Sequence, residues 1–236
     1  MFSRTEMLIG KEALEKLHCT KVAIFGIGGV GSYVAEALAR TGVGHLVLID
    51  SDNIVISNIN RQIHATHETI GKSKVNVMKE RILSINPNIN VTTFQMLYNK
   101  ETASKLLSTE YDYVVDAIDM VTSKIDLIER CTNLNIPIIS SMGAGNKLDP
   151  TKLEITDIYK TNVCPLAKVI RHELRKRGIK KLKVIYSKET PAKPISVNEE
   201  ASRKQTPSSV IFVPATAGLI IASEVIRSII SNSDET

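Results

Sequence analysis

The chain has 236 residues, 43% hydrophobic and 23% charged, which is enough to bury one ample core and excludes an intrinsically disordered chain. Its formal net charge of +5 at pH 7 is a mild indication of a polyanionic partner. No apolar run approaches the roughly 18 residues of a membrane span, since the longest, 210–222, contains Pro214 and Thr216. The first residues lack the apolar region of a signal peptide, so we expect a cytoplasmic protein.

Strand-like and helix-like segments alternate through the first 140 residues. The strands are short β-branched apolar runs, and the helices carry apolar residues at helical spacing. In chain order we expect strand 21–28, helix 31–41, strand 45–50, a polar loop 51–67, helix 71–85, strand 89–96, helix 101–107, strand 111–117, helix 121–134 and strand 136–140. This alternation predicts βαβ units, with a parallel sheet covered by helices on both faces.

The texture changes after Gly145. There we expect a half-exposed strand 152–160, a basic helix 164–178, strand 182–187, a long polar connection 188–208, and a strand-like stretch leading into an apolar helix from about Pro214. The fold class is therefore α/β: a Rossmann-like doubly wound sheet, mainly parallel, with a C-terminal strand/helix extension.

A glycine loop joins the first expected strand to the first helix. Residues 26–31 (GIGGVG) fit G-x-G-x-x-G, a pattern that lets backbone N–H groups and a helix N-terminus face a phosphate. Asp50 ends the next strand, 19 residues after Gly31, where a carboxylate reaches a ribose. The motif alone leaves both a dinucleotide and ATP open.

The following segments favour ATP. Arg61 follows a second acid, Asp52, and its guanidinium can fork onto phosphate oxygens. Lys74 lies near the start of the next helix, where a further phosphate would bind. Asp119 follows the strand expected on the other side of the glycine-loop strand, which is a favourable place for an Mg²⁺ ligand.

As an ordered set, GIGGVG, LVLIDSD, SNINRQ, GKSK and VVDAID resemble the ATP-dependent adenylating family of ubiquitin-activating-enzyme-like proteins over residues 2–145. The resemblance implies that ATP is bound by Gly26, Gly28, Gly29, Gly31, Asp50, Asp52, Ser57, Asn58, Arg61 and Lys74. It implies catalytic roles for Arg61 and Lys74, and for Asp119 as the Mg²⁺ ligand. It also implies a homodimer in which Arg4 reaches the γ-phosphate in the partner subunit's site.

The chain departs from the sulfur-carrier activators of this family. Those proteins commonly carry two C-x-x-C zinc pairs, whereas Cys19, Cys131 and Cys164 form none. The segments ARTGVGHLVLID, SNINRQIHAT, SINPNI and SMGAGNKLDPTKLEITDIYKT are most similar to one subfamily, the tRNA threonylcarbamoyladenosine dehydratases.

That similarity implies an ATP-dependent cyclising dehydration of threonylcarbamoyladenosine next to the tRNA anticodon. It would proceed through an acyl adenylate and release pyrophosphate and AMP. Residues 1–236 would then form a single adenylating domain. Residues 1–145 would be its nucleotide-binding Rossmann-like part, and 146–236 a substrate- or tRNA-facing extension.

A basic cluster supports a tRNA partner. Residues 168–183 hold eight Lys or Arg against one acid, although a solvated helix face would have the same composition. The expected tRNA contacts are Lys168, Arg171, Arg175, Lys176, Arg177, Lys180 and Lys181.

Several single residues have two interpretations each. Cys131 lies on an apolar helical stripe and is expected to be buried. Cys164 begins the basic helix, so a sulfur-relay role with a partner protein stays open. Lys124 is expected to face either the nucleotide or solvent. His64 supports the nucleotide loop or packs elsewhere.

Three other functions stay open. One is adenylation of a sulfur-carrier or ubiquitin-like protein C-terminus. Another is an NAD(P)-dependent oxidoreductase, which would leave Arg61, Lys74 and Asp119 unexplained. The last is a non-catalytic tRNA-binding module that retains a nucleotide fold.

Overall fold

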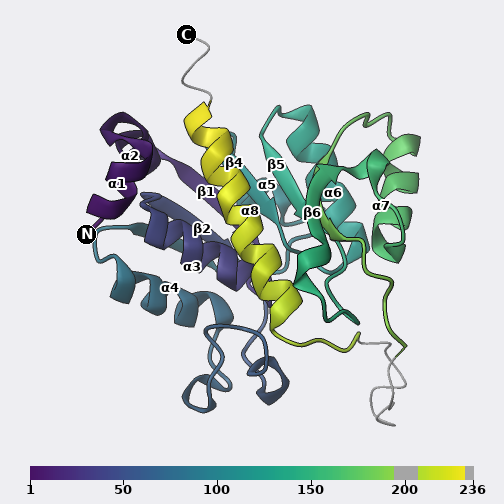
Figure 1. Cartoon of the computed structure of the whole chain (residues 1–236), viewed down its shortest axis with the longest axis horizontal. Coiled ribbons are helices and arrows are strands. Elements are labelled where there is room, and N and C mark those ends of the chain that lie inside the picture. The colour runs from purple at the N-terminus through teal and green to yellow at the C-terminus, as the bar shows by residue number, and fades with distance from the viewer. Residues whose placement is uncertain (194–206, 232–236) are drawn as a thin grey trace.

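A seven-stranded sheet forms the centre of the computed structural model, which describes residues 1–193 and 207–231 (Figure 1). The strands are β1 (Lys21–Phe25), β2 (His45–Ile49), β3 (Asn90–Phe94), β4 (Tyr113–Asp116), β5 (Ile138–Ser141), β6 (Leu153–Asp157) and β7 (Lys183–Ser187). Their order in the sheet is β3-β2-β1-β4-β5-β7-β6. Only the β6–β7 pair among these strands is antiparallel. The expectation of a doubly wound, mainly parallel sheet is confirmed.

Helices cover both faces of this sheet (Figure 1). They are α1 (Ser3–Ile9), α2 (Lys11–Cys19), α3 (Gly31–Thr41), α4 (Lys74–Ile85), α5 (Ala103–Leu106), α6 (Val121–Asn133), α7 (Pro165–Lys176) and α8 (Phe212–Ser231). Apolar residues of α2, α3, α4 and α8 share one core cluster, whereas those of α5, α6 and α7 belong to two clusters on the opposite face. Short 3₁₀ turns lie at Ile56–Asn58, His67–Thr69, Pro150–Lys152 and Ile158–Lys160.

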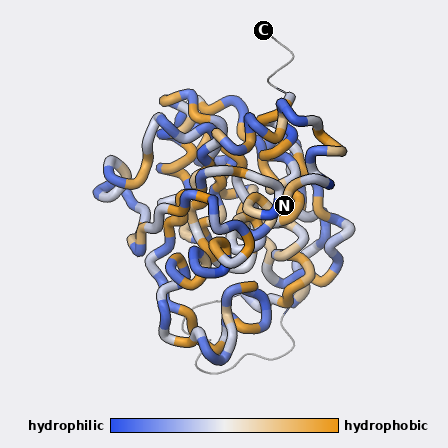
Figure 2. The backbone as a smooth tube through the Cα atoms, turned by 90° about the vertical axis from the view of Figure 1, so that its left-hand side faces the viewer, coloured by the Kyte–Doolittle hydropathy of each residue, from blue (hydrophilic) through white to orange (hydrophobic). Residues whose placement is uncertain are grey.

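The alternation of side chains along the central strands explains this layering. In β1, Val22 and Ile24 enter the α3/α8 core, while Ala23 and Phe25 enter the opposite one. Because both faces are buried, the strand is apolar throughout, as a central parallel strand requires. Figure 2 shows short hydrophilic and hydrophobic stretches alternating along the chain. This pattern is expected of surface helices that bury one face against the sheet.

The C-terminal helix corrects two expectations. Among the described residues no strand lies between β7 and α8, and α8 begins at Phe212, so Pro214 is its third residue rather than its first. Nor is the apolar run short: α8 has 20 residues and a mean hydropathy of 1.5, long and apolar enough by composition to cross a membrane. One such helix is weak evidence of a membrane span, since core helices can have the same composition. Half of the most apolar 18 residues of α8 are buried in the protein, mainly by packing against α3.

The two N-terminal helices were not expected as separate elements. Gly10 lies between them with φ of 84°, a conformation open to glycine and rarely to other residues, and it ends α1. In α2, Leu14 and Leu17 are buried, whereas α1 has no buried residue.

Candidate active site

A cavity of about 1100 Å³ opens where β1, β2, β4 and β5 end. Ligands of open α/β sheets bind at this carboxyl edge, where the strand order reverses. The sheet order places that reversal between β1 and β4. The segments predicted to bind ATP therefore converge on one place, although Gly26 and Asp119 are 93 positions apart in the sequence.

The glycine loop is shaped by two close approaches. Gly26 has φ of 92°, and a Cβ there would lie 2.6 Å from the carbonyl oxygen of Ala117. A Cβ on Gly31 would lie 1.8 Å from the carbonyl oxygen of Gly26. Both positions therefore require glycine. Gly26, Gly28 and Gly29 line the cavity, whereas Gly31 serves the packing of α3 against β1.

Asp50 holds the loop from the end of β2. Its Oδ2 accepts the Ile27 N–H at 2.7 Å, and its Oδ1 accepts the Asp52 N–H at 2.8 Å. Burial raises the pKa of Asp50, while the charge of Lys74 opposes that rise. A carboxylate has about four acceptor sites, so Asp50 can position the loop and still accept a ribose hydroxyl.

Lys74 and Asp52 form an ion pair at the cavity wall. The Lys74 Nζ lies 2.7 Å from Asp52 Oδ2, and Lys74 is 6% exposed although it is the first residue of α4. A buried ammonium beside the glycine loop is well placed to meet a phosphate. Asp52, whose side chain is 63% exposed, would then be free to exchange partners.

Asn58, the last residue of the 3₁₀ turn after β2, and Arg61, three residues later, both line the cavity. Asn58 is buried, and its carbonyl accepts the Arg61 N–H at 3.1 Å, while its Oδ1 accepts the Val55 N–H at 3.2 Å. Arg61 Nη1 donates to the Ser57 carbonyl at 2.7 Å. Asn58 and Arg61 line the cavity, but Ser57 does not. The backbone of Ser57 thus orients the arginine, and a phosphate contact by Ser57 itself stays a prediction.

Asp119 lies on the loop after β4, exposed and lining the cavity. Among the described residues, no group of three or more His, Cys, Asp or Glu could hold a metal. Mg²⁺ commonly takes one or two carboxylates together with substrate phosphates. An accessible Asp119 facing the glycine loop fits that donor set.

A buried ion pair lies beneath this loop, and it overturns both interpretations of Lys124. Lys124 and Asp116 are each fully buried, with Nζ 2.8 Å from Oδ2. The same Nζ donates to Ser140 Oγ at 3.2 Å and to the Ser141 carbonyl at 3.0 Å. Lys124 thus faces neither nucleotide nor solvent. It ties the end of β4 to the end of β5.

Gln62 and Lys147 are buried lining residues that the sequence analysis did not single out. Gln62 is 5% exposed, and its Oε1 has no hydrogen-bond partner among the described residues, as expected of an acceptor that awaits a ligand. Lys147 is 3% exposed and lies in the segment after β5. No sequence motif marked either residue, because tertiary packing places each of them in the cavity wall.

His64 and Cys131 are buried packing residues. His64 is 3% exposed, both its ring nitrogens lack a hydrogen-bond partner among the described residues, and burial lowers its pKa to about 4. Cys131 is fully buried, as expected, and burial raises its pKa to about 12. Cys164 caps the start of α7, is 4% exposed and lines the cavity.

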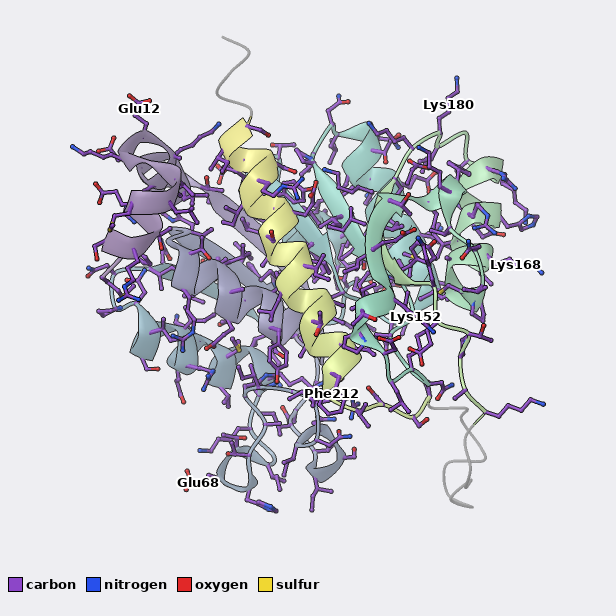
Figure 3. All side chains as sticks on the ribbon, viewed as in Figure 1. Glu12, Glu68, Lys152, Lys168, Lys180 and Phe212 are labelled. Carbon is purple, nitrogen blue, oxygen red and sulfur yellow. The ribbon has the colours of Figure 1, made fainter. Side chains whose placement is uncertain are left out.

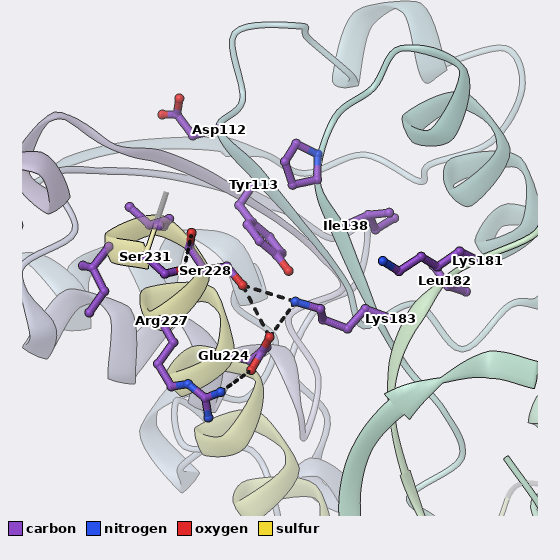
Figure 4. Close-up of a pocket in the computed structure, with 13 residues that line it drawn as sticks. Asp112, Tyr113, Ile138, Lys181, Leu182, Lys183, Glu224, Arg227, Ser228 and Ser231 are labelled. Atoms are coloured by element: carbon purple, nitrogen blue, oxygen red, sulfur yellow. Dashed lines mark hydrogen bonds and ion pairs between the residues drawn. The ribbon is translucent and has the colours of Figure 1, made fainter. Parts of the chain in front are cut away.

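A second cavity, of about 720 Å³, lies at the opposite end of the sheet, between the starts of β4 and β7 and the end of α8 (Figure 4). Lys183 crosses it to Glu224 and Ser228, which hydrogen-bond its Nζ at 2.5 and 3.3 Å. Its polar centre is therefore occupied by these side chains. It also lies away from the glycine loop, so we assign the chemistry to the first cavity.

The cations of α7 and of residues 177–181, which follow it, differ in the contacts they make. Arg171 donates to the Thr161 carbonyl at 3.0 Å, and Arg175 lies over the Tyr159 ring at 5.3 Å. Lys176 and Arg177 both pair with Glu173. Lys168, Lys180 and Lys181 are exposed, and Figure 3 shows the first two at the outer edge of the molecule.

Arg4 lies on α1, exposed, and does not line the cavity of its own chain. The same helix exposes Met7 by 87% and Leu8 by 85%. Within α1, therefore, two large apolar side chains are exposed and none is buried.

Comparison with known proteins adds to this geometry. The ThiF family matches residues 2–236. The chain belongs to the ThiF family. Among its relatives, tRNA threonylcarbamoyladenosine dehydratase of Bacillus subtilis is 47% identical over 241 residues, covering 98% of this chain and 95% of that protein. The Escherichia coli protein of that name is 43% identical over 174 residues, covering 74% of this chain and 65% of its own length.

A solved structure extends the likeness to the whole fold. The Escherichia coli tRNA N6-threonylcarbamoyladenosine dehydratase in complex with ATP superposes with a TM-score of 0.92 at 35% identity. The match covers 100% of this ThiF-family chain and 96% of that one.

Proposed function

We propose that this protein is an ATP-dependent tRNA threonylcarbamoyladenosine dehydratase. The observation that carries the proposal is the cavity that gathers the glycine loop, Arg61, Lys74 and Asp119, in a fold that superposes on an ATP-bound dehydratase. The relatives of that name, similar over most of this chain, support the substrate class.

The chemistry begins at the carboxylate of the threonyl group. It attacks the α-phosphorus of ATP, pyrophosphate leaves, and an acyl adenylate forms. The neighbouring carbamoyl group then attacks the activated carbonyl in the same molecule, closing a five-membered ring and releasing AMP. Intramolecular closure needs no enzyme nucleophile, because proximity alone supplies up to about 7–11 kcal/mol.

The residues of the site neutralise charge in the first step. Lys74 would exchange Asp52 for a phosphate oxygen. The guanidinium N–H groups of Arg61 that do not donate to the Ser57 carbonyl would bind the departing pyrophosphate. Mg²⁺ held by Asp119, aided by Asp52, would supply further positive charge on the phosphates. Losing one such contact typically costs about 10²–10³ in kcat.

A homodimer completes the proposed site. Arg4 would enter the cavity of the partner subunit, since it does not line its own. The exposed Met7 and Leu8 of α1 would be covered in that assembly. Fewer residues than expected remain for tRNA: Lys168, Lys180 and Lys181 are the candidates that our proposal retains, because the other four cations make contacts within the chain.

We do not extend the proposal to a sulfur relay, because Cys164 faces the cavity and is 4% exposed. A role in modifying tRNA is consistent with a cytoplasmic location. Adenylation of a carrier protein remains the second candidate, because the family includes such activators.

ATP–pyrophosphate exchange separates the two candidates. The dehydratase proposal predicts exchange that requires tRNA carrying threonylcarbamoyladenosine and falls at least about 100-fold in Lys74→Ala and Asp119→Ala. Exchange that instead requires a small protein ending in diglycine, and ignores tRNA, would replace the proposal with carrier activation. Wild-type rates in both variants would show that the site is wrongly assigned.

A further inference from the structure

One wall of the cavity takes no part in the proposed ATP contacts. It is formed by residues 141–147, which begin at the last residue of β5, and by Cys164 and the first residues of α7. Among the described residues of this wall, Lys147 is the one charged side chain, and Cys164 is the other titratable one. The acyl group is bonded to the α-phosphate, on the side opposite the departing pyrophosphate, and this wall is free of the proposed ATP contacts and could receive it.

Lys147 is held in a defined position. Its Nζ donates to the Gly143 carbonyl at 3.0 Å and reaches the Ser187 carbonyl at 3.5 Å. An ammonium has three donors, so these two contacts leave one position of the nitrogen for a ligand. The preceding residue, Asn146, has φ of 58°, a left-handed conformation that functional segments often contain.

The burial of Lys147 disfavours its charged form. Burial lowers the pKa of Lys147 from the usual lysine value. The Cys164 thiol at the start of α7 and the Glu189 carboxylate after β7 oppose that shift. A buried amine with a lowered pKa is a competent proton acceptor.

Ring closure releases one proton whichever carbamoyl atom attacks. An electron pair of the carbamoyl group forms the bond to the acyl carbon, the bond from that carbon to the AMP oxygen breaks, and that electron pair leaves with AMP. A carbamoyl nitrogen loses its hydrogen as the ring forms. The carbamoyl group is a poor nucleophile while its nitrogen keeps that hydrogen, so a proton acceptor within reach accelerates the step.

We propose that Lys147 is a further catalytic residue, the acceptor of the proton that the carbamoyl group releases during ring closure. The proposal rests on the dehydratase function and deepens it. Lys74 and Arg61 would serve adenylation at one end of the cavity, and Lys147 would serve cyclisation at the other.

Lys147→Arg is the discriminating variant. Arginine keeps the positive charge and the donors to the two carbonyls but cannot accept a proton near neutral pH. We expect tRNA-dependent pyrophosphate exchange within about threefold of the wild type and a single-turnover ring closure at least about 100-fold slower. Lys147→Met, checked for folding by circular dichroism, should show the same split, whereas the exposed Lys152→Met should match the wild type.

The pH profile gives a second readout. Wild-type ring closure should rise with pH and level off below the ordinary lysine pKa of about 10.4, and Lys147→Arg should lose that rise. A Lys147→Arg variant that closes the ring at the wild-type rate, or that slows exchange and closure equally, would overturn the inference and leave Lys147 a structural or binding role. Wild-type protein that exchanges pyrophosphate but never dehydrates the nucleoside would instead defeat the dehydratase proposal.

Discussion

The fully buried pair of Lys124 and Asp116 gives the sharpest stability prediction. Lys124→Met keeps the length of the side chain and removes the ammonium. The Asp116 carboxylate would then keep the Ser140 hydroxyl at 2.6 Å and the Ile118 N–H at 3.1 Å as its hydrogen-bond donors, without a countercharge. Removing one partner of such a pair costs about 3–5 kcal/mol, because an uncompensated charge stays buried. A domain of this size has about 5–15 kcal/mol in total.

The assay is urea unfolding at 25 °C, followed by far-UV circular dichroism, for a set of three variants. Lys124→Met should lose about 3–5 kcal/mol. Lys124→Met with Asp116→Asn should recover a large part of that loss, since no buried charge remains. The exposed Lys105→Met should stay within about 0.5 kcal/mol of the wild type. A loss below about 1 kcal/mol in the single variant, or a double variant no more stable than the single, would refute the reasoning.

Three further outcomes are expected. Arg4→Ala and Lys74→Ala should each be inactive. After equal amounts are mixed and subunits exchange, about half of the dimers are heterodimers with one complete site each, so about one quarter of the active sites should be restored. No recovery despite exchange would place Arg4 outside the partner's site. Burial lowers the pKa of His64 from 6.5 to about 4 in the folded protein. Neutral His64 should therefore contribute up to about 3 kcal/mol to the free energy of unfolding above pH 6.5, and this contribution should be lost as pH falls toward 4. Urea unfolding of His64→Phe should lack this pH dependence, and a variant with unchanged pH dependence would show that burial of His64 is not its cause. With a thiol reagent on native protein, exposed Cys19 should react quickly and Cys131, whose pKa is raised to about 12, only on unfolding; early labelling of Cys131 in peptide mapping would contradict its burial.

The elements that position the nucleotide could be predicted because local pattern and topology agree there. Helix α3 spans the expected residues 31–41, since its apolar stripe and flanking glycines mark both ends. Asp50, Lys74 and Asp119 converge because the carboxyl ends of parallel strands share one edge of the sheet. No contact had to be known for that expectation.

The residues that could not be predicted depend on contacts between distant segments. Lys124 looks like a surface lysine until Asp116 and the β5 end are placed beside it. The cavity position of Lys147 depends on Ser187, 40 residues later. The start of α8 was predicted wrongly because Pro214 suggested the first helical residue, whereas the helix begins at Phe212. Since the first four N–H groups of a helix have no partner within it, proline at the third position loses no hydrogen bond.

The most direct measurement is the mass of the modified nucleoside. Purified protein is incubated with ATP, Mg²⁺ and tRNA carrying threonylcarbamoyladenosine, and the tRNA is then digested under conditions that preserve the cyclic form. The dehydratase proposal predicts that this nucleoside loses the mass of one water, with one AMP released per nucleoside, only when ATP is present and not with Lys74→Ala. An unchanged nucleoside mass with protein that binds ATP and the tRNA would contradict it.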